Sequence, residues 1–313
     1  MIIAAVIGVV VIVLYAIAAP ALCRHQAPAI ATRLVVGASV VAAVSGVFIL
    51  AVLAFTWIGQ FPLVAAQGAW SPTALRNDSP VPAGPAIVSG VLVALAVISV
   101  VLSVIRRVSA LFAVHSVCRD LTAVGGLVVL DDARPEAFTT PQPGGRVIVT
   151  TGLLRALDPR ERQVLLAHER SHLAHPHAWW NLAADLAAAV NPLLRPAARA
   201  VATAVERWAD EDAARTVGDR RLVAATLVRV AQLQTRFTTG SLAASAPTGP
   251  AATGGDVEAR VRALLAPPPR RRPWAVTALV TVLLAGSLPA AAVQHTGEAL
   301  FEHAARPTVT QHA

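Results

Sequence analysis

The chain has 313 residues, of which 55% are hydrophobic and only 14% charged, and its mean hydropathy is +0.61. This composition excludes an ordinary soluble domain and predicts an integral membrane protein. The formal net charge is +8, and every basic residue in that sum is an arginine. No predicted helix carries a basic stripe with interleaved aromatic residues, so we expect no nucleic-acid partner. Two distant cysteines do not make a disulfide framework.

Four apolar stretches are long enough to cross a bilayer, which requires about 20 apolar residues. They are residues 2–22, 34–58, 86–105 and 274–293. The first stretch has no positively charged segment before it, which favours an uncleaved anchor over a signal peptide. Residues 1–105 are therefore predicted to form a three-span membrane region, and residues 273–293 a fourth transmembrane helix.

Most arginines near these stretches lie on one side, and the loop of residues 59–85 on the other side has only Arg76, offset by Asp78. The arginines of the first side are Arg24, Arg33, Arg106, Arg107 and the cluster 270–272. By the positive-inside rule these segments face the cytoplasm. We therefore expect a multi-pass protein of the plasma membrane, with the bilayer as a partner, residues 106–272 on the cytoplasmic side and both termini outside.

Between the third span and residue 158 the pattern changes to short strands. Residues 126–130, 137–140 and 146–150 are separated by Pro- and Gly-containing turns, which makes a small antiparallel sheet plausible. Arg146, Val147, Ile148 and Val149 are the candidate edge strand that would hold a substrate as an added strand. A purely structural strand is an equally good interpretation.

The sequence His168-Glu169-Arg170-Ser171-His172 has the HExxH pattern and lies on a predicted helix. Asp158 as N-cap, Pro159 at the first helical position and Glu161 as capping-box partner predict its start, and Pro176 predicts its end near residue 175. His168 and His172 then lie about 40° apart around the axis. Both imidazoles can reach one Zn²⁺, leaving a position for water, and the Glu169 carboxylate beside them can act as general base.

A second helix, predicted from residue 195 to residue 216, carries an acidic cluster. Glu206 and Asp210 share one face at i and i+4. Glu206 is the candidate third metal ligand, and Asp210 could accept the free ring N–H of a ligand histidine. The competing interpretation is a solvated acidic face. His175 lies too far along the first helix to bind the same ion, so His175 and His177 are placed at the helix end, where they would suit the C-terminal dipole.

Residues 179–194 are moderately apolar but carry Asn181, Asp185 and Asn191. We favour an interfacial or re-entrant helix, and core packing for the two metal helices is the alternative. Residues 238–272 are predicted to be a flexible linker with a short amphipathic helix at 257–265, and residues 294–313 a disordered tail.

HExxH at 168–172 followed by ExxAD at 206–210 resembles the membrane-embedded gluzincin peptidases, of the HtpX and CAAX-protease type and, more closely, of the BlaR/MecR type. The segments 137–140, 146–154, 177–181 and 191–192 are similar to the strand, turn and helix around the zinc helix in those proteins. The resemblance implies one Zn²⁺ per chain bound by His168, His172 and Glu206, with Glu169 catalytic and Asp210 orienting a ligand. The penicillin-binding sensor domain of the BlaR/MecR receptors is expected to be missing.

The predicted architecture is a mainly α integral membrane protein: four transmembrane helices and a small α+β zincin-like domain at residues 106–237. We expect a zinc-dependent endopeptidase that cleaves protein or peptide substrates at the cytoplasmic membrane face. Its role would be membrane-protein quality control or cleavage of a cytoplasmic transcriptional repressor. The alternative is a catalytically silent membrane scaffold or sensor that keeps the peptidase fold.

Overall fold

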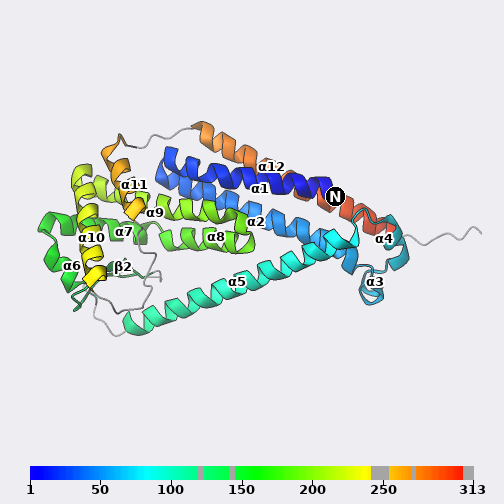
Figure 1. The fold of residues 1–313 in the computed structure, drawn as a ribbon, viewed down its shortest axis with the longest axis horizontal. Helices are drawn as coiled ribbons and strands as arrows, with labels where there is room; N and C mark the ends of the chain where they lie inside the picture. Colours follow the sequence, from blue (N-terminus) through cyan, green and yellow to red (C-terminus); the bar gives the residue numbers. More distant parts are fainter. Residues whose placement is uncertain (119–122, 124, 141–144, 241–253, 269–272, 306–313) are drawn as a thin grey trace, which may run out of the picture.

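A computed structural model describes residues 1–118, 123, 125–140, 145–240, 254–268 and 273–305. Long helices lie side by side along the length of the molecule, and a small sheet with shorter helices lies at one end (Figure 1). The N-terminus lies toward the opposite end. The fold thus separates a helical bundle from the lobe that carries the HExxH segment.

Three helices of the described residues are long and apolar enough to cross a membrane. They are α1 (Ile2–His25), α2 (Pro28–Ile58) and α5 (Ala83–Cys118), and they correspond to the first three predicted spans. Pro28 at the first position of α2 lets the chain reverse directly after α1, because a proline there lacks only an N–H that would be unpaired anyway. These three helices indicate a membrane protein.

The fourth predicted span lies within α12 (Pro273–Ala305), which packs along α1 and α2. Many side chains of its first half lie outside the described residues, so the count of four spans stays a prediction. The predicted disordered tail is wrong for residues 294–305, which continue α12. Leu300 and Ala304 are buried against Leu75, and the Phe301 ring lies 5.0 Å from the ring of Trp70. This apolar packing orders the helix end; residues 306–313 lie outside the described part of the chain.

The connection between α2 and α5 forms a cap at the end of the bundle where α12 ends. It contains two short helices, α3 (Pro62–Gly68) and α4 (Pro72–Asp78), and α4 packs against α12. The Trp70 indole donates a 2.8 Å hydrogen bond to the carbonyl of Gly59, which fastens the connection to the end of α2. The cap therefore joins the end of α12 to the bundle.

The sheet has three strands, β1 (Leu127–Leu130), β2 (Ala137–Thr139) and β3 (Val147–Thr150), in the order β1-β3-β2. β2 pairs antiparallel with β3 as predicted, but β1 pairs parallel with it. The prediction that Arg146, Val147, Ile148 and Val149 form an edge strand is wrong, because β3 is the central strand and both of its edges are paired. All four β3 residues are buried, as expected for a strand covered on both faces.

The lobe continues with α6 (Thr151–Ala156) and α7 (Pro159–Ala174), and α7 is the predicted HExxH helix. Its predicted capping box is confirmed: the Asp158 side chain accepts from the backbone of Glu161, and the Glu161 carboxylate accepts from the Asp158 N–H at 2.9 Å. These reciprocal bonds define where the helix starts. The HExxH residues therefore lie within a well-anchored helix.

The remaining helices follow the predicted order. They are α8 (His177–Val190), the 3-10 turn η1 (Pro192–Leu194), α9 (Arg195–Val217), α10 (Arg220–Gly240) and α11 (Gly254–Leu265). α9 ends at Gly218, whose φ of 77° is left-handed and suits glycine. Of the predicted linker 238–272, residues 241–253 and 269–272 lie outside the described residues, while α11 packs against α9 and α10.

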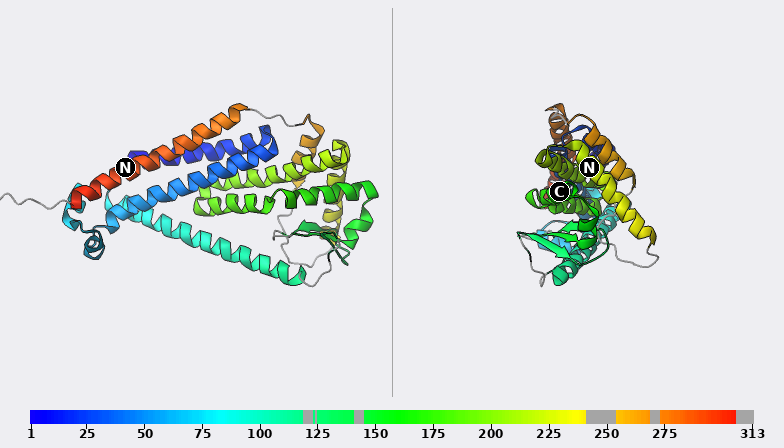
Figure 2. Two further views of the ribbon diagram at one scale, coloured as in Figure 1. Left: turned by 180° about the vertical axis from the view of Figure 1, so that it is seen from behind. Right: turned by 90° about the vertical axis from the view of Figure 1, so that its left-hand side faces the viewer.

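The hairpin of α8, η1 and α9 packs among the apolar helices (Figures 1 and 2). The shared core is rich in small residues, including Ala19, Ala38, Ala187, Ala197 and Ala204. Small side chains let helix axes approach closely. The tip reaches the middle of α2, where Asn191 lies beside Gly46. Residues 179–194 therefore lie next to predicted spans, and their entry into a bilayer stays a prediction.

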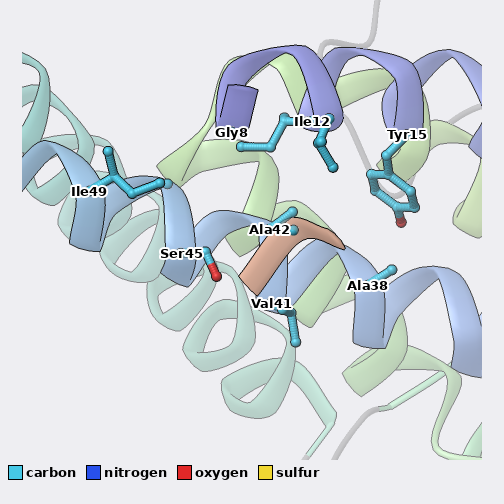
Figure 3. A pocket seen from close by; sticks show the side chains of 11 residues that line it. Gly8, Ile12, Tyr15, Ala38, Val41, Ala42, Ser45 and Ile49 are labelled. Carbon is cyan, nitrogen blue, oxygen red and sulfur yellow. The ribbon is translucent and has the colours of Figure 1, made fainter. Parts of the chain in front are cut away.

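A small apolar cavity remains between α1 and α2 (Figure 3). Ile12, Val41 and Ile49 line it, and its polar groups are the hydroxyls of Tyr15 and Ser45. The Tyr15 hydroxyl donates to the Val35 carbonyl at 2.6 Å, which ties α1 to α2. No histidine, cysteine or carboxylate side chain is among the described residues that line this cavity.

A substitution at Gly152, on α6, tests how closely the loop before β2 approaches this helix. A Cβ at this position would lie 2.1 Å from the Ala133 carbonyl oxygen, which is far inside van der Waals contact. Gly152→Ala should therefore lower the free energy of unfolding by about 1–3 kcal/mol, measured by chemical denaturation in detergent. Gly37→Ala is the control, because a Cβ there meets nothing within 4 Å. Equal stability of the two variants would contradict the close approach.

Candidate metal centre

The packing of α7 against α9 brings the predicted ligands together. His168 and His172 are one turn apart on α7, with their Nε2 atoms 3.2 Å from each other. The Glu206 carboxylate, from α9, lies 3.5 Å from His168 Nε2 and 3.7 Å from His172 Nε2. The first of these distances is to Glu206 Oε2 and the second to Oε1, so two imidazole nitrogens and one carboxylate from two helices converge on one point.

These separations fit a zinc ion. Bonds of about 2.0–2.1 Å in tetrahedral geometry place neighbouring ligand atoms about 3.3–3.4 Å apart. The observed 3.2, 3.5 and 3.7 Å lie close to that spacing. His168, His172 and Glu206 form a group that could hold a metal ion. Three protein ligands are typical of catalytic zinc sites, which leave a fourth position for water or substrate.

As predicted, Asp210 contacts a ligand histidine: it lies against the ring nitrogen of His168 that faces away from the other ligands. Its Oδ1 lies 3.1 Å from His168 Nδ1, so the ring can donate there while Nε2 faces the other ligands. Asp210 is only 2% exposed, and a carboxylate in such a place needs a cationic partner. That partner is a residue that sequence reasoning missed.

Arg260, on α11, is this partner. It donates to both carboxylate oxygens of Asp210, at 2.8 and 2.7 Å, and its Nη1 lies 3.2 Å from Glu206 Oε2. Arg260 shares one face of α11 with Val257, three residues before it, and Leu264, four residues after it. An arginine within an apolar helix face was the available signal, but only the fold shows which acid it meets.

The predicted position of His177 is wrong. The residue was predicted to lie at the end of the HExxH helix and to interact with the helix dipole. Instead it is the first residue of α8, it is 1% exposed, and its Nδ1 lies 2.9 Å from His172 Nδ1. His175 does lie at the end of α7, as predicted, with its Nε2 3.0 Å from Asp212 and its ring stacked on Trp208.

Burial and neighbouring charges shift the pKa values of the side chains in this site. Burial of the Glu169 carboxyl raises its pKa, and the neighbouring His168 offsets part of that effect. Burial also favours neutral His168, but its hydrogen bonds to Asp210 and Glu206 outweigh this and raise its pKa to about 10. Burial and the adjacent His168 lower the pKa of His172 to about 4. A proton on His168 would have to leave before a metal bound there.

Glu206 and Asp210 remain ionised despite their burial. Burial alone would raise the pKa of the Glu206 carboxyl, but the hydrogen bond from His168 and the charge of Arg260 hold it well below its usual range. The same opposing effects lower the pKa of Asp210. An anionic ligand at Glu206 and a buried carboxyl of raised pKa at Glu169 are compatible with metal-assisted hydrolysis.

Comparison with known proteins supports this interpretation for part of the chain. The sequence model of Peptidase family M48 matches residues 102–193. The match includes the end of α5, the sheet, α7 and α8, and therefore His168, Glu169 and His172. The match ends before α9, so the assignment of Glu206 and Asp210 to the site depends on the geometry of the structure. The match indicates a metallopeptidase. No solved structure matches the chain.

Metal content should distinguish the ligand carboxylate from the catalytic one. Glu206→Gln removes the anionic ligand, so we expect detergent-purified protein to lose most of its zinc. Glu169→Gln should retain about one zinc per chain, as we expect of the wild type, because that side chain is not in the ligand set. Elemental analysis per mole of protein measures this. Zinc retained in Glu206→Gln, or lost equally in both variants, would contradict the assignment.

Stability should reveal the role of Arg260. Arg260→Met leaves the buried Asp210 carboxylate without its cation, which should cost about 3–5 kcal/mol of unfolding free energy. Arg262→Met is the matched control on the same helix, because the ion pair of Arg262 with Glu258 is exposed and exposed pairs contribute about 0–1 kcal/mol. Denaturant titration of both variants checks the difference. Equal stability would show that Arg260 is not the partner that Asp210 requires.

Proposed function

We propose that this protein is a membrane-bound, zinc-dependent endopeptidase. The observation that carries the proposal is the convergence of His168, His172 and Glu206 beside the buried carboxylate of Glu169. The three defined residues of the HExxH pattern, His168, Glu169 and His172, lie in the segment that matches Peptidase family M48. A silent scaffold is less favoured, because it would have no need to keep every group that the chemistry uses.

The residues of this chain divide the catalytic work. Bound Zn²⁺ would supply Lewis-acid chemistry that polarises the substrate carbonyl and lowers the pKa of water to about 7. Glu169 accepts the proton of the attacking water and returns it to the leaving amine. Its raised pKa brings the carboxyl closer to the range where it can both accept and release a proton near neutrality. Asp210 keeps His168 in the orientation that presents Nε2.

The strand β2 is the proposed substrate-binding edge, in place of β3. β2 pairs with β3 through one edge and lies against α7. In the described residues it is the terminal strand on that side of the sheet. An extended peptide added to β2 would be held by backbone hydrogen bonds, which tolerate many sequences. Such tolerance suits a peptidase that acts on unfolded segments.

Contacts between α9 and the end of α1 support a site near the membrane surface. Arg207, next to Glu206, donates to the Cys23 carbonyl at 2.8 Å, and the Arg33 guanidinium lies 5.0 Å from the centre of the Trp208 ring. The ligands are therefore level with the end of α1 and the start of α2, where Arg24 and Arg33 lie. The positive-inside rule assigns that side to the cytoplasm.

The rise along α9 gives the distance between the metal centre and the tip of the hairpin formed by α8, η1 and α9. Between Leu194, in the middle of the apolar helices, and Arg207 a helix rises about 20 Å. Half the hydrocarbon thickness of a bilayer is about 15 Å. A tip near the midplane thus places the metal centre just outside the hydrocarbon. We propose cleavage of membrane proteins close to the cytoplasmic surface of the plasma membrane, as in quality control, with a cytoplasmic transcriptional repressor as the alternative substrate.

Proteolysis of an unfolded probe tests the function. Detergent-purified protein with zinc should cleave β-casein, and a metal chelator should stop the reaction. Glu169→Gln should lower the rate by about 10²–10⁴-fold, since general-base catalysis contributes that much. Arg170→Gln changes the adjacent exposed residue and should leave the rate unchanged. Gel analysis of cleavage products measures both, and equal rates in Glu169→Gln and wild type would contradict the proposed mechanism.

A further inference from the structure

The two ligand histidines are held in different ways on the side away from the metal position. His168 Nδ1 faces the Asp210 carboxylate at 3.1 Å, whereas His172 Nδ1 faces another imidazole nitrogen, His177 Nδ1, at 2.9 Å. The His172 and His177 rings meet nearly at right angles, with centroids 4.8 Å apart. This geometry directs a ring edge of each histidine at the other and suits one N–H···N hydrogen bond.

The direction of that hydrogen bond follows from metal binding. A neutral imidazole carries one proton, and a histidine that binds a metal through Nε2 must carry it on Nδ1. His172 Nδ1 is then the donor, and His177 Nδ1 must be the acceptor. The proton of neutral His177 consequently lies on its Nε2. The ligand set thus determines the tautomers of both rings.

We propose that His177 is the positioning residue for His172, accepting its Nδ1–H and thereby holding the second ligand in the orientation that metal binding needs. This inference rests on the metal centre proposed above. Hydrogen-bond partners of this kind fix the ring and tautomer of metal-binding histidines, and their loss typically costs 10–100-fold in metal affinity. His177 thus does for His172 what Asp210 does for His168.

Two polar atoms at the start of α8 are buried without a hydrogen-bond partner in the described part of the chain. In the described residues, His177 Nε2 and Asn181 Oδ1 are both buried and without a hydrogen-bond partner. They lie one turn apart at the start of α8. With the proton on Nε2, the His177 ring presents a donor and Asn181 Oδ1 an acceptor, but no hydrogen bond joins the two.

The charge balance explains why an imidazole suits this position better than a carboxylate. Asp210 is compensated by Arg260, which also contacts Glu206. A carboxylate behind His172 would be a further buried negative charge, and the contacts of Arg260 are already taken up by these two acids. Burying an unpaired charge is costly. A neutral acceptor orients His172 without that cost.

The test measures metal affinity, which does not depend on knowing a substrate. The dissociation constant for Zn²⁺ is determined by competition with a chromophoric chelator, on full-length protein in detergent. His177→Phe keeps a ring but has no acceptor, and we expect its affinity to fall 10–100-fold. His177→Asn carries Oδ1 near the position of Nδ1 and should retain affinity within a few fold of wild type.

His175→Phe is the matched control. His175 lies two residues away and stacks on Trp208, but its Nε2 contacts Asp212 instead of a metal ligand. Its affinity should equal that of wild type. The absorption spectrum of the Co²⁺-substituted protein adds a second readout, since it reports coordination geometry: His177→Phe should alter the spectrum, and His177→Asn should restore it.

The outcomes separate the two proposals. If wild type binds Zn²⁺ and His177→Phe binds it equally tightly, the role of His177 is wrong and the metal centre stands. If His177→Asn is as weak as His177→Phe, the effect comes from packing and the hydrogen-bond role is also wrong. If wild type binds no Zn²⁺, the metal centre itself fails. Thermal unfolding of each metal-free variant checks that the fold is retained.

Discussion

The buried carboxylate of Asp210 connects the three helices that make the metal centre. It accepts from His168 on α7 and from Arg260 on α11, and it belongs to α9, which also carries Glu206. A carboxylate that is only 2% exposed cannot remain ionised without such partners. The same ion pair therefore sets the orientation of a ligand ring and determines where α11 docks. Stability and site geometry depend on one interaction.

The position of the centre relative to the apolar helices has a second cause, the close packing of α8 and α9 against α1 and α2. Alanines dominate this core, so the helix axes can approach closely. Arg207 then caps the end of α1 through the Cys23 carbonyl. The ligand Glu206 is thus placed by helices that are themselves candidate membrane spans, so the height of the centre is a property of the bundle. This arrangement is the basis of our proposal that the substrates have cleavage sites near a bilayer surface.

Sequence reasoning succeeded where the controlling interactions are local. The capping box of α7, the one-turn spacing of His168 and His172 and the i, i+4 spacing of Glu206 and Asp210 depend only on helix geometry. It failed where distant segments meet. β3 is central because β1 pairs parallel with it, and a parallel partner leaves no hairpin signal. Residues 294–305 are helical because Leu300 and Phe301 find apolar partners near α4.

The amino-acid sequence alone determined the chemistry that we propose for this protein: the candidate ligands, the candidate general base and the apolar stretches can all be read from its motifs and composition. The tertiary structure alone decided which groups support that chemistry. Arg260 and His177 bond to residues of other helices, and nothing in their local sequence selects Asp210 or His172 as the partner. The physical reason is that a buried polar group must find a complementary partner, and long-range packing determines which one is within reach.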